Sequence, residues 1–395
     1  MAPSDMPNIV VIGGGYAGLT AAARIAEAKT HVTVTLVDAK SAFVERIRLH
    51  EIAAGSAPRD LEYRDFMESR GGRFVQGRVT AIDAGGKNVE IASKDGAAAV
   101  LDYDMLIYAL GSHTDLESVP GTAEHAFGLD TVETSIELAR KVGILSKTGG
   151  KVLIAGGGLT AIEAACEFAE RLPGLQVAIA PGRSFGPDGD PGGLSVAGHD
   201  HVLAVLERLN VDIVDGARIE KLEPDAAELE DGRSIPFDVC VWGAGFVVPT
   251  LAAEAGIRVN EAGQIVTDPT LTSVSHPDIV AVGDAAEVVV EPAGTCRMSC
   301  AAGRPMGERG AQTVLDHLAG REPAPFEFSY SFRCVSLGRD DGLIQFVDAQ
   351  DRPVEEIWTG PRGARWKEYI CRRTLNGVGF DDDLGPPPDT PPRFG

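Results

Sequence analysis

The fold of this chain is decided by the stretch Asn8-Ile9-Val10-Val11-Ile12-Gly13-Gly14-Gly15-Tyr16-Ala17-Gly18. Residues 8–12 form an apolar, β-branched run that predicts a buried parallel strand, and residues 19–26 predict a helix. The glycines between them have the spacing G-x-G-x-x-G. Gly13 permits a tight turn, Gly15 lets the backbone approach a pyrophosphate, and Gly18 lets helix and strand pack closely. The stretch therefore predicts a dinucleotide-binding βαβ unit, with the pyrophosphate on the helix N-terminus.

The next predicted strand, residues 32–37, ends in an acidic residue. Asp38 lies 20 residues beyond Gly18, which is the distance expected of a carboxylate that binds a ribose hydroxyl. The alternative is a glycine-rich turn in some other α/β protein. The first unit is expected to bind its cofactor through Gly13, Gly15, Tyr16, Ala17, Gly18, Asp38, Ala39 and Lys40.

A second fingerprint lies about a domain further along the chain. The predicted strand 151–155 leads into Gly156-x-Gly158-x-x-Ala161, and a helix is predicted from Leu159 to Glu170. Alanine is an accepted variant at the third position. The second nucleotide is expected at Gly156, Gly158, Leu159 and Thr160.

The end of the following strand differs between the two units. Pro181 falls where Asp38 lies in the first unit, and Arg183 falls where Lys40 lies. A carboxylate at the strand end would accept hydrogen bonds from a ribose 2′-OH and repel a 2′-phosphate. Its absence, with an arginine nearby, favours NADPH over NADH as the second nucleotide. The alternative is that Arg183 belongs to a solvated loop, because residues 181–193 are rich in glycine and proline.

A chain that binds two nucleotides side by side is typical of a flavoenzyme, in which a nicotinamide passes hydride to FAD. Shorter signals at 109–111, 243–245 and 283–285 complete the set. Their order predicts an α/β fold with two Rossmann-like dinucleotide-binding domains, the FAD domain being interrupted by an inserted NAD(P) domain, plus a small C-terminal α+β region. The expected boundaries are 1–115 and 251–325 for the FAD domain, 116–250 for the NAD(P)H domain, 326–380 for the C-terminal region and 381–395 for a flexible tail.

Composition and charge limit the classes of partner that the protein is expected to bind. The chain has 36 basic and 58 acidic residues and a net charge of −22, which argues against nucleic acid or an anionic membrane as the main partner. Residues 1–5 carry no basic segment of a signal peptide, and no run of about 18 apolar residues predicts a membrane span. We expect a cytoplasmic protein with a small-molecule electron acceptor; peripheral membrane contact and a homodimer are left open.

The six cysteines form no Cys-x-x-Cys and no cluster with zinc-ligand spacing, so no metal is expected. Cys296 and Cys300 would share a face of a helix. They are interpreted as two reduced, half-buried thiols, with a redox pair as the alternative.

Taken together, these motifs resemble the two-dinucleotide-binding-domain flavoproteins, and within them the type II NADH dehydrogenases and the apoptosis-inducing-factor-like quinone reductases. The likeness covers nearly all of residues 7–350, and it also shows in residues 49–55, 101–107, 119–121 and 335–339. The resemblance implies that the first fingerprint and Asp38 hold the ADP part of FAD. It implies further cofactor contacts at Ala109, Gly111, Gly245, Gly283 and Asp284, with Asp284 bonded to the ribityl chain.

The same resemblance assigns catalytic candidates. Glu163 matches the glutamate that helps to place the nicotinamide ring over the flavin. Arg48, His50 and Glu51 fall in the stretch that runs along the isoalloxazine edge. His50 or His113 could donate a proton to a reduced quinone; the alternative is that both are polar surface or cap residues.

The chain departs from the family pattern in two places. Residues 39–46 contain no cysteine, which excludes dithiol relay chemistry and the single-cysteine peroxidase branch. Residues 296–307, where respiratory members carry a glutamine-rich helix, contain Arg297 and Arg304 and no glutamine. We therefore expect a small soluble acceptor, anionic or quinone-like, and Arg297 beside the flavin. The competing interpretation is that both arginines pair with surface acids.

Two other functions stay open. One is a biosynthetic flavin oxidase or monooxygenase that acts on a soluble natural product, and the other is a nucleotide-binding, redox-responsive scaffold. Residues 352–373 combine six basic residues with aromatic ones. They are interpreted as a surface helix on the flavin domain, with contact to a membrane interface as the alternative.

Overall fold

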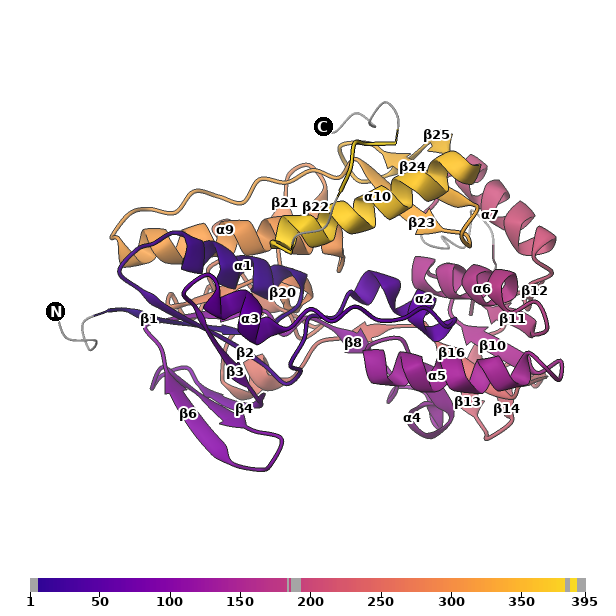
Figure 1. The fold of residues 1–395 in the computed structure, drawn as a ribbon, viewed down its shortest axis with the longest axis horizontal. Coiled ribbons are helices and arrows are strands. Elements are labelled where there is room, and N and C mark those ends of the chain that lie inside the picture. Colours follow the sequence, from indigo (N-terminus) through magenta and orange to yellow (C-terminus); the bar gives the residue numbers. More distant parts are fainter. Residues whose placement is uncertain (1–5, 183–184, 186–192, 381–383, 389–395) are drawn as a thin grey trace.

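The computed structural model describes residues 6–182, 185, 193–380 and 384–388, and Figure 1 shows two lobes joined by crossing segments. The first lobe is built on a five-stranded parallel sheet in the order β19-β7-β1-β2-β3. Val10 of the central strand lies opposite Thr35 on one side and Leu106 on the other. The strands are β1 (Asn8–Ile12), β2 (Thr33–Asp38), β3 (Arg73–Gln76), β7 (Met105–Tyr108) and β19 (Ile279–Ala281).

The second lobe repeats this plan with strands in the order β12-β11-β10-β16-β9. Its parallel strands are β9 (Ala126–Gly128), β10 (Lys151–Ala155), β11 (Gln176–Ala180), β12 (Asp212–Ile213) and β16 (Val239–Trp242). The helices of this lobe are α4 (Thr122–His125), α5 (Val132–Leu145), α6 (Leu159–Arg171) and α7 (Val196–Arg208). The predicted fold class is therefore confirmed: each fingerprint joins the central strand of a parallel sheet to a helix, and a later strand returns the chain to the first sheet.

The remaining helices of the first lobe pack around its sheet or line the path to the second lobe. α1 (Tyr16–Glu27) lies along α9 (Cys300–Leu318) (Figure 1). A Cβ on Gly307 of α9 would collide with the backbone oxygen of Ala17, so the two helices pack backbone to backbone. The short helices are α2 (Leu49–Ala53), which packs on α5 and α6 of the second lobe, α3 (Tyr63–Glu68) and α8 (Leu251–Glu254).

Small two- and three-stranded sheets, antiparallel except for one parallel pair, accompany both lobes. β4 (Arg78–Asp83), β5 (Asn88–Ala92) and β6 (Ala98–Asp102) form one three-stranded sheet, and β13 (Ile219–Leu222), β14 (Ala226–Leu229) and β15 (Ser234–Pro236) form another. β18 (Ile265–Val266) pairs with β20 (Ala286–Glu287), and β21 (Val289–Val290) pairs with β22 (Gly294–Thr295). β8 (His113–Thr114) pairs with β17 (Phe246–Val247) where the chain passes between the lobes.

The C-terminal region is an antiparallel sheet covered by a long helix. β23 (Phe332–Ser336), β24 (Gly342–Val347) and β25 (Pro353–Trp358) form the sheet, and α10 (Gly360–Val378) packs on β24, α1 and α9. Trp366 of α10 is 1 % exposed and meets the ring of Trp358. The segment around residues 352–373 thus contains a helix that packs on the flavin lobe, as the sequence analysis favoured.

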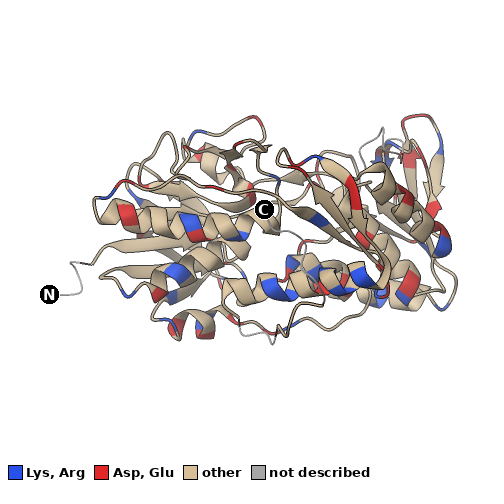
Figure 2. Cartoon of the chain, turned by 90° about the horizontal axis from the view of Figure 1, so that it is seen from above, with Lys and Arg blue, Asp and Glu red and all other residues tan. Residues whose placement is uncertain are grey.

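Two further properties of the helices bear on possible partners. Acidic and basic side chains are interspersed along the helices rather than separated by sign (Figure 2). Among the described residues, no helix combines the length and apolar character that crossing a bilayer requires.

The predicted start of one helix is wrong. The expected helix over 296–307 begins at Cys300, after Ser299 in an extended conformation. Cys296 instead donates its backbone N–H to Val288, so Cys296 and Cys300 do not share a helix face. All six cysteines are free thiols.

Candidate functional site

A cavity of about 730 Å³ runs between the two lobes and is lined by segments from all three regions of the chain. The first fingerprint and residues 109–113 form one side, Thr160 and Glu163 of α6 reach it from the second lobe, and Lys367 reaches it from α10. The predicted residues that line it are Gly13, Gly15, Tyr16, Ala17, Asp38, Ala39, Lys40, His50, Ala109, Gly111, Thr160, Glu163, Gly283 and Asp284.

The glycines of the first fingerprint divide into packing and access positions. A Cβ on Gly18 would collide with the backbone oxygen of Gly13 and lie 2.9 Å from the Cβ of Ala109, so only glycine fits between helix and strand. A Cβ on Gly15 would meet nothing within 4 Å, which leaves the N-terminus of α1 open toward the cavity. The first turn of α1 carries no acidic residue. This cradle fits a pyrophosphate.

Two carboxylates fix the rest of this wall. Asp38 accepts hydrogen bonds from the backbone N–H of Gly14 at 2.7 Å and of Lys40 at 2.8 Å, so it holds the loops that flank the cradle. Asp284 accepts a hydrogen bond from the Ser112 hydroxyl at 2.7 Å. Both carboxylates line the cavity, at positions that suit the ribose and ribityl hydroxyls of FAD.

The second fingerprint has the same geometry with one difference. A Cβ on Gly156 would lie 2.9 Å from the backbone of Gly243, while a Cβ on Gly158 would meet nothing within 4 Å. The third position is Ala161, whose own Cβ lies close to Gly243: a Cβ added to Gly243 would lie 3.3 Å from it, a tight contact. Arg183, the basis of the expected NADPH preference, lies outside the described residues. Of the other predicted residues, Gly18, Gly156, Gly158, Leu159 and Gly245 are not among those that line the cavity.

At the end of the cavity toward the second lobe, Glu163 and Lys367 form a buried ion pair. Lys367 Nζ lies 2.8 Å from Glu163 Oε1, and the same oxygen accepts the Ser336 N–H at 2.9 Å. Burial alone would raise the pKa of Glu163, but Lys367 and His50 outweigh it and lower that pKa. Burial alone would lower the pKa of Lys367, but Cys334 and Glu163 raise it well above its usual value. Both groups are therefore ionised at neutral pH.

His50 lies beside this pair on α2. It is 3 % exposed, it lines the cavity, and its Nε2 has no hydrogen-bond partner among the described residues. Burial lowers the pKa of His50, against the opposing effect of Glu163 and Glu51. The side chain is therefore neutral at pH 7, with one ring nitrogen that remains unsatisfied.

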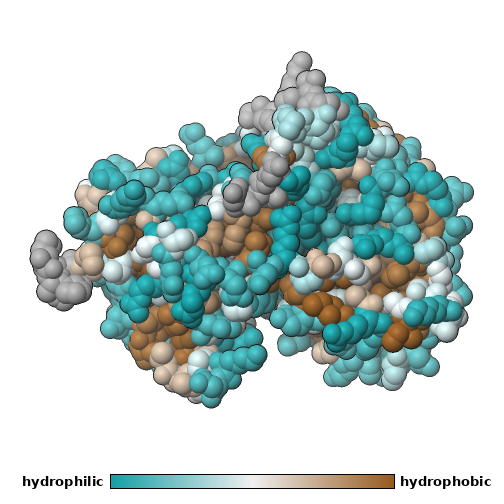
Figure 3. All heavy atoms as spheres, in the orientation of Figure 1, coloured by the Kyte–Doolittle hydropathy of each residue, from teal (hydrophilic) through white to brown (hydrophobic). Residues whose placement is uncertain are grey.

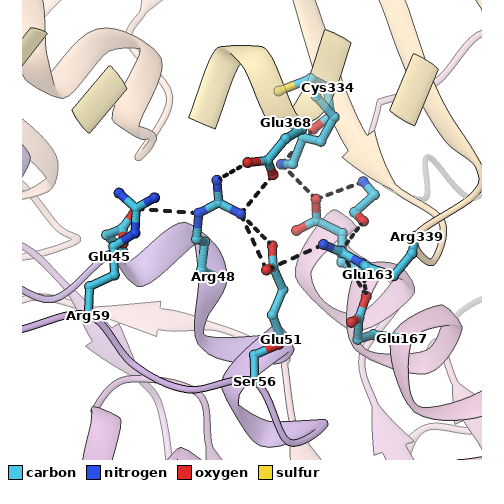
Figure 4. A network of polar contacts seen from close by, with 12 residues as sticks. Glu45, Arg48, Glu51, Ser56, Arg59, Glu163, Glu167, Cys334, Arg339 and Glu368 are labelled. Carbon is cyan, nitrogen blue, oxygen red and sulfur yellow. Dashed lines mark hydrogen bonds and ion pairs between the residues drawn. The ribbon is translucent and has the colours of Figure 1, made fainter. Parts of the chain in front are cut away.

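Arg48, predicted at the flavin edge, takes part in an ionic network instead (Figure 4). It lies 2.8 Å from Glu368 of α10 and 3.1 Å from Glu51, and it is absent from the cavity lining. Arg339 continues the network, bridging Glu51 at 3.3 Å and the buried Glu167 of α6 at 2.8 Å. The network ties α2, α6, α10 and the β23–β24 turn together directly behind His50 and Glu163.

Arg297 also lies away from the cavity lining. Its Nε is 2.6 Å from Asp351 Oδ2, and its guanidinium lies 4.0 Å from the centre of the Tyr330 ring. Arg304 pairs with Glu308 of its own helix. This geometry matches the competing interpretation, in which both arginines pair with acids. Met298, Ser299 and Cys300 reach the cavity from this segment instead.

Four charged residues of the lining were not predicted from the sequence: Arg46, Arg78, Asp130 and Lys367. Lys367 was counted only as part of a basic segment, because nothing local signals that α10 turns it inward. Arg46 binds Asp130 at 2.9 Å and donates to the Ser112 carbonyl, joining the first lobe to the second. The nearby residues Leu49 and His50 belong to a stretch that resembles the family, so the sequence pointed to this region. It does not indicate which way each side chain points.

Comparison with known proteins agrees with the fold and the cavity. Residues 7–303, well over half of the chain, match the pyridine nucleotide-disulphide oxidoreductase family. An NADH dehydrogenase-like protein of Mycobacterium tuberculosis is 28% identical over 98% of this chain and 100% of its own length. A type II NADH:quinone oxidoreductase of Staphylococcus haemolyticus is 26% identical over 95% of this chain and 96% of its own length.

The solved structure of NDH2 from Plasmodium falciparum in complex with NADH superposes with a TM-score of 0.80 at 14% identity, covering 93% of this chain and 94% of that one. At this identity the likeness shows the fold alone. The predicted resemblance is confirmed. The chain belongs to the pyridine nucleotide-disulphide oxidoreductase family and is an FAD- and NAD(P)H-dependent oxidoreductase.

Proposed function

We propose that this protein transfers electrons from NAD(P)H through FAD to a small quinone-like acceptor. One observation carries the proposal: a single cavity runs from the first fingerprint to the ionised Glu163–Lys367 pair. A hydride donor and an acceptor can thus meet the same flavin. The staphylococcal relative, named as a type II NADH:quinone oxidoreductase, supports a quinone as the acceptor class.

The first wall of the cavity would hold FAD. Gly13, Gly15 and the N-terminus of α1 would receive the pyrophosphate, while Asp38 and Asp284 would bind hydroxyls. Bound FAD would accept hydride from the nicotinamide and release electrons to the acceptor. The protein contributes position and charge to this chemistry.

On the donor side, α6 would present Thr160 and Glu163 to the nicotinamide half of NAD(P)H. Glu163 is held by Lys367 and the Ser336 N–H, so its second carboxylate oxygen remains free to accept a hydrogen bond from a carboxamide N–H. A carboxylate fixed in this way orients a ring without changing its own charge.

On the acceptor side, Lys367 and His50 are the groups we assign in place of Arg297. Lys367 is protonated and buried, so it can donate a hydrogen bond to a quinone carbonyl and stabilise negative charge that develops there. His50 is neutral and lines the cavity, so its unpartnered Nε2 could hold or pass a proton there.

Anaerobic stopped-flow kinetics test the proposal. The reduced enzyme is mixed with menadione, with oxygen and with a one-electron dye, and the flavin absorbance is followed. We expect menadione to reoxidise the flavin fastest. Fast reaction with oxygen that yields peroxide would favour the oxidase or monooxygenase alternative, and reduced flavin that persists for minutes with every acceptor would favour the scaffold.

We further propose that NADPH is used at least as well as NADH, because Pro181 replaces the ribose-binding carboxylate and Arg183 follows it. Arg183→Ala should lower kcat/KM for NADPH roughly 10- to 100-fold and leave NADH little changed, if it binds the 2′-phosphate directly. Equal losses with both donors would contradict this assignment.

The proposed boundaries of the domains remain those expected from the sequence. We also propose a cytoplasmic location, which the six free thiols support because disulfides are rare in that compartment.

A further inference from the structure

Phe246 is a large apolar side chain that lies 44 % exposed in a protein whose other aromatic side chains are mostly buried or half-buried. It is not scattered on the outer surface, because it lines the same cavity as Thr160 and Glu163. An apolar ring that stays open to water loses the free energy of burial. The exposure therefore suggests that a ligand covers it.

The backbone position of Phe246 is fixed by the crossing between the lobes. It lies in β17, paired with Thr114 of β8, three residues beyond Gly243, against which Gly156 of the second fingerprint packs. Thr114 in turn donates its N–H to Asp130 at 3.1 Å. Phe246 is thus held at the rim of the nicotinamide side, next to the fingerprint that would bind the donor.

Its ring is positioned as well as its backbone. The Arg46 guanidinium lies 5.4 Å from the centre of the Phe246 ring, within the range of a cation–π interaction. Arg46 itself is fixed by Asp130 and the Ser112 carbonyl. A residue from the first lobe thus holds an aromatic ring of the second where the two lobes meet.

Figure 3 shows the surface hollowed between the lobe that carries β4–β6 and the lobe that carries α5. The residues that line the main cavity continue toward this side, since Ala39, Lys40, Val44, Gly77 and Arg78 also border a second, adjoining cavity of about 680 Å³. The two cavities therefore adjoin each other on this side of the molecule.

We propose that Phe246 is a positioning residue for the hydride donor: its ring packs against the planar nicotinamide ring of NAD(P)H, with Arg46 holding the phenyl group in place. The inference rests on the proposed function and adds a determinant of donor binding to it. The nicotinamide is favoured over the adenine because Phe246 shares its cavity with Glu163 and Thr160, whereas the adenine half of the donor would follow the strand end at Pro181.

The test is the anaerobic reductive half-reaction alone, in which no acceptor takes part. Phe246→Ala should raise the Kd for NAD(P)H roughly three- to tenfold, the contribution of one aromatic stacking contact, while the limiting rate of flavin reduction changes by less than about twofold. Phe246→Tyr should bind the donor like wild type. Phe246→Leu, which keeps the apolar bulk but not the flat ring, should resemble Phe246→Ala.

Val289→Ala is the matched control, because Val289 is 57 % exposed and does not line the cavity. Its Kd should equal that of wild type. The proposal is wrong if Phe246→Ala binds the donor with wild-type Kd, or if it only loses FAD and melts earlier. If wild type itself is not reduced by NAD(P)H, the proposed function and this inference both fall, whereas slow reoxidation by quinones with normal reduction contradicts the acceptor assignment alone.

Discussion

The two walls of the cavity are built in different ways. The first wall consists of neighbours in sequence, Gly13 to Gly18 with Asp38, and its geometry comes from backbone sterics and carboxylate-to-backbone hydrogen bonds. The second wall joins His50, Glu163 and Lys367, which come from three separate regions of the chain and are held by ion pairs. Local constraints thus shape the wall that we propose holds FAD, and long-range charge pairing shapes the wall that we propose faces the donor and the acceptor.

Among substitutions in the first wall, Gly18→Ala is expected to have the largest effect on stability and FAD binding. The added Cβ would collide with the Gly13 backbone oxygen, which cannot move without opening the turn, so we expect a loss of about 3 kcal/mol or more and little bound FAD. Thermal unfolding and the flavin-to-protein absorbance ratio measure both effects. The matched change in the second unit is Ala161→Gly, where the fold already accommodates a Cβ, and it should cost only about 1 kcal/mol. If Gly18→Ala costs no more than Ala161→Gly, the first fingerprint also accommodates a Cβ and the steric argument is wrong.

A break in the second wall should come next in size. Lys367→Met leaves the Glu163 carboxylate buried without its cation, a loss that approaches about 3 kcal/mol. The retained Ser336 N–H and uptake of a proton by Glu163 keep it near that value. We also expect slower flavin reoxidation by menadione.

Arg297→Ala is the control for this prediction. It removes a cation from the same region, but Asp351 keeps a partner in Arg333 and the cavity lining is untouched. Its two half-reactions should match wild type. If Arg297→Ala slows reoxidation and Lys367→Met does not, the acceptor lies on the side that the sequence analysis expected.

The contrast between the walls also explains what the sequence could predict. Both βαβ units were found with bounds close to those observed, because strand periodicity and glycine spacing act within about thirty residues. Asp38 was placed correctly at the end of β2, because its distance from Gly18 is fixed by the length of one helix and one strand.

Side chains that depend on distant partners could not be placed in the same way. Lys367 points into the cavity because α10 packs on β24 with Trp366 inward, and no local pattern distinguishes it from the other basic residues of its segment. The ion pair of Arg297 could not be predicted for the same reason, since its partner Asp351 lies 54 positions away. Charge pairing across such distances is set by tertiary packing.

Asp38→Ala is expected to destabilise the first wall less than Gly18→Ala does. It removes two charge-assisted hydrogen bonds to Gly14 and Lys40, and we expect a loss of about 1.5–3 kcal/mol and a lower flavin content. Asp38→Asn keeps one acceptor oxygen and should fall between the variant and wild type. Flavin release on heating, followed by fluorescence, measures the difference. Unchanged flavin content in Asp38→Ala would mean that the loop holds its shape without the carboxylate.

The smallest effect concerns His50, and it appears as a pH dependence. Burial lowers the pKa of His50 in the folded protein below its usual value near 6.5, so the unfolded chain binds a proton at a pH where the folded one does not. Folding stability from this group is therefore fully present above about pH 6.5 and is lost as the pH falls toward the folded pKa, with a slope of at most about 1.4 kcal/mol per pH unit. His50→Gln removes the titration, so its melting temperature should decline less than that of wild type between about pH 7 and pH 5.5. Scanning calorimetry over this range decides the matter. Parallel curves for the two proteins would mean that His50 titrates normally, and its neutral, unpartnered nitrogen could then not be the proton-holding group of the second wall.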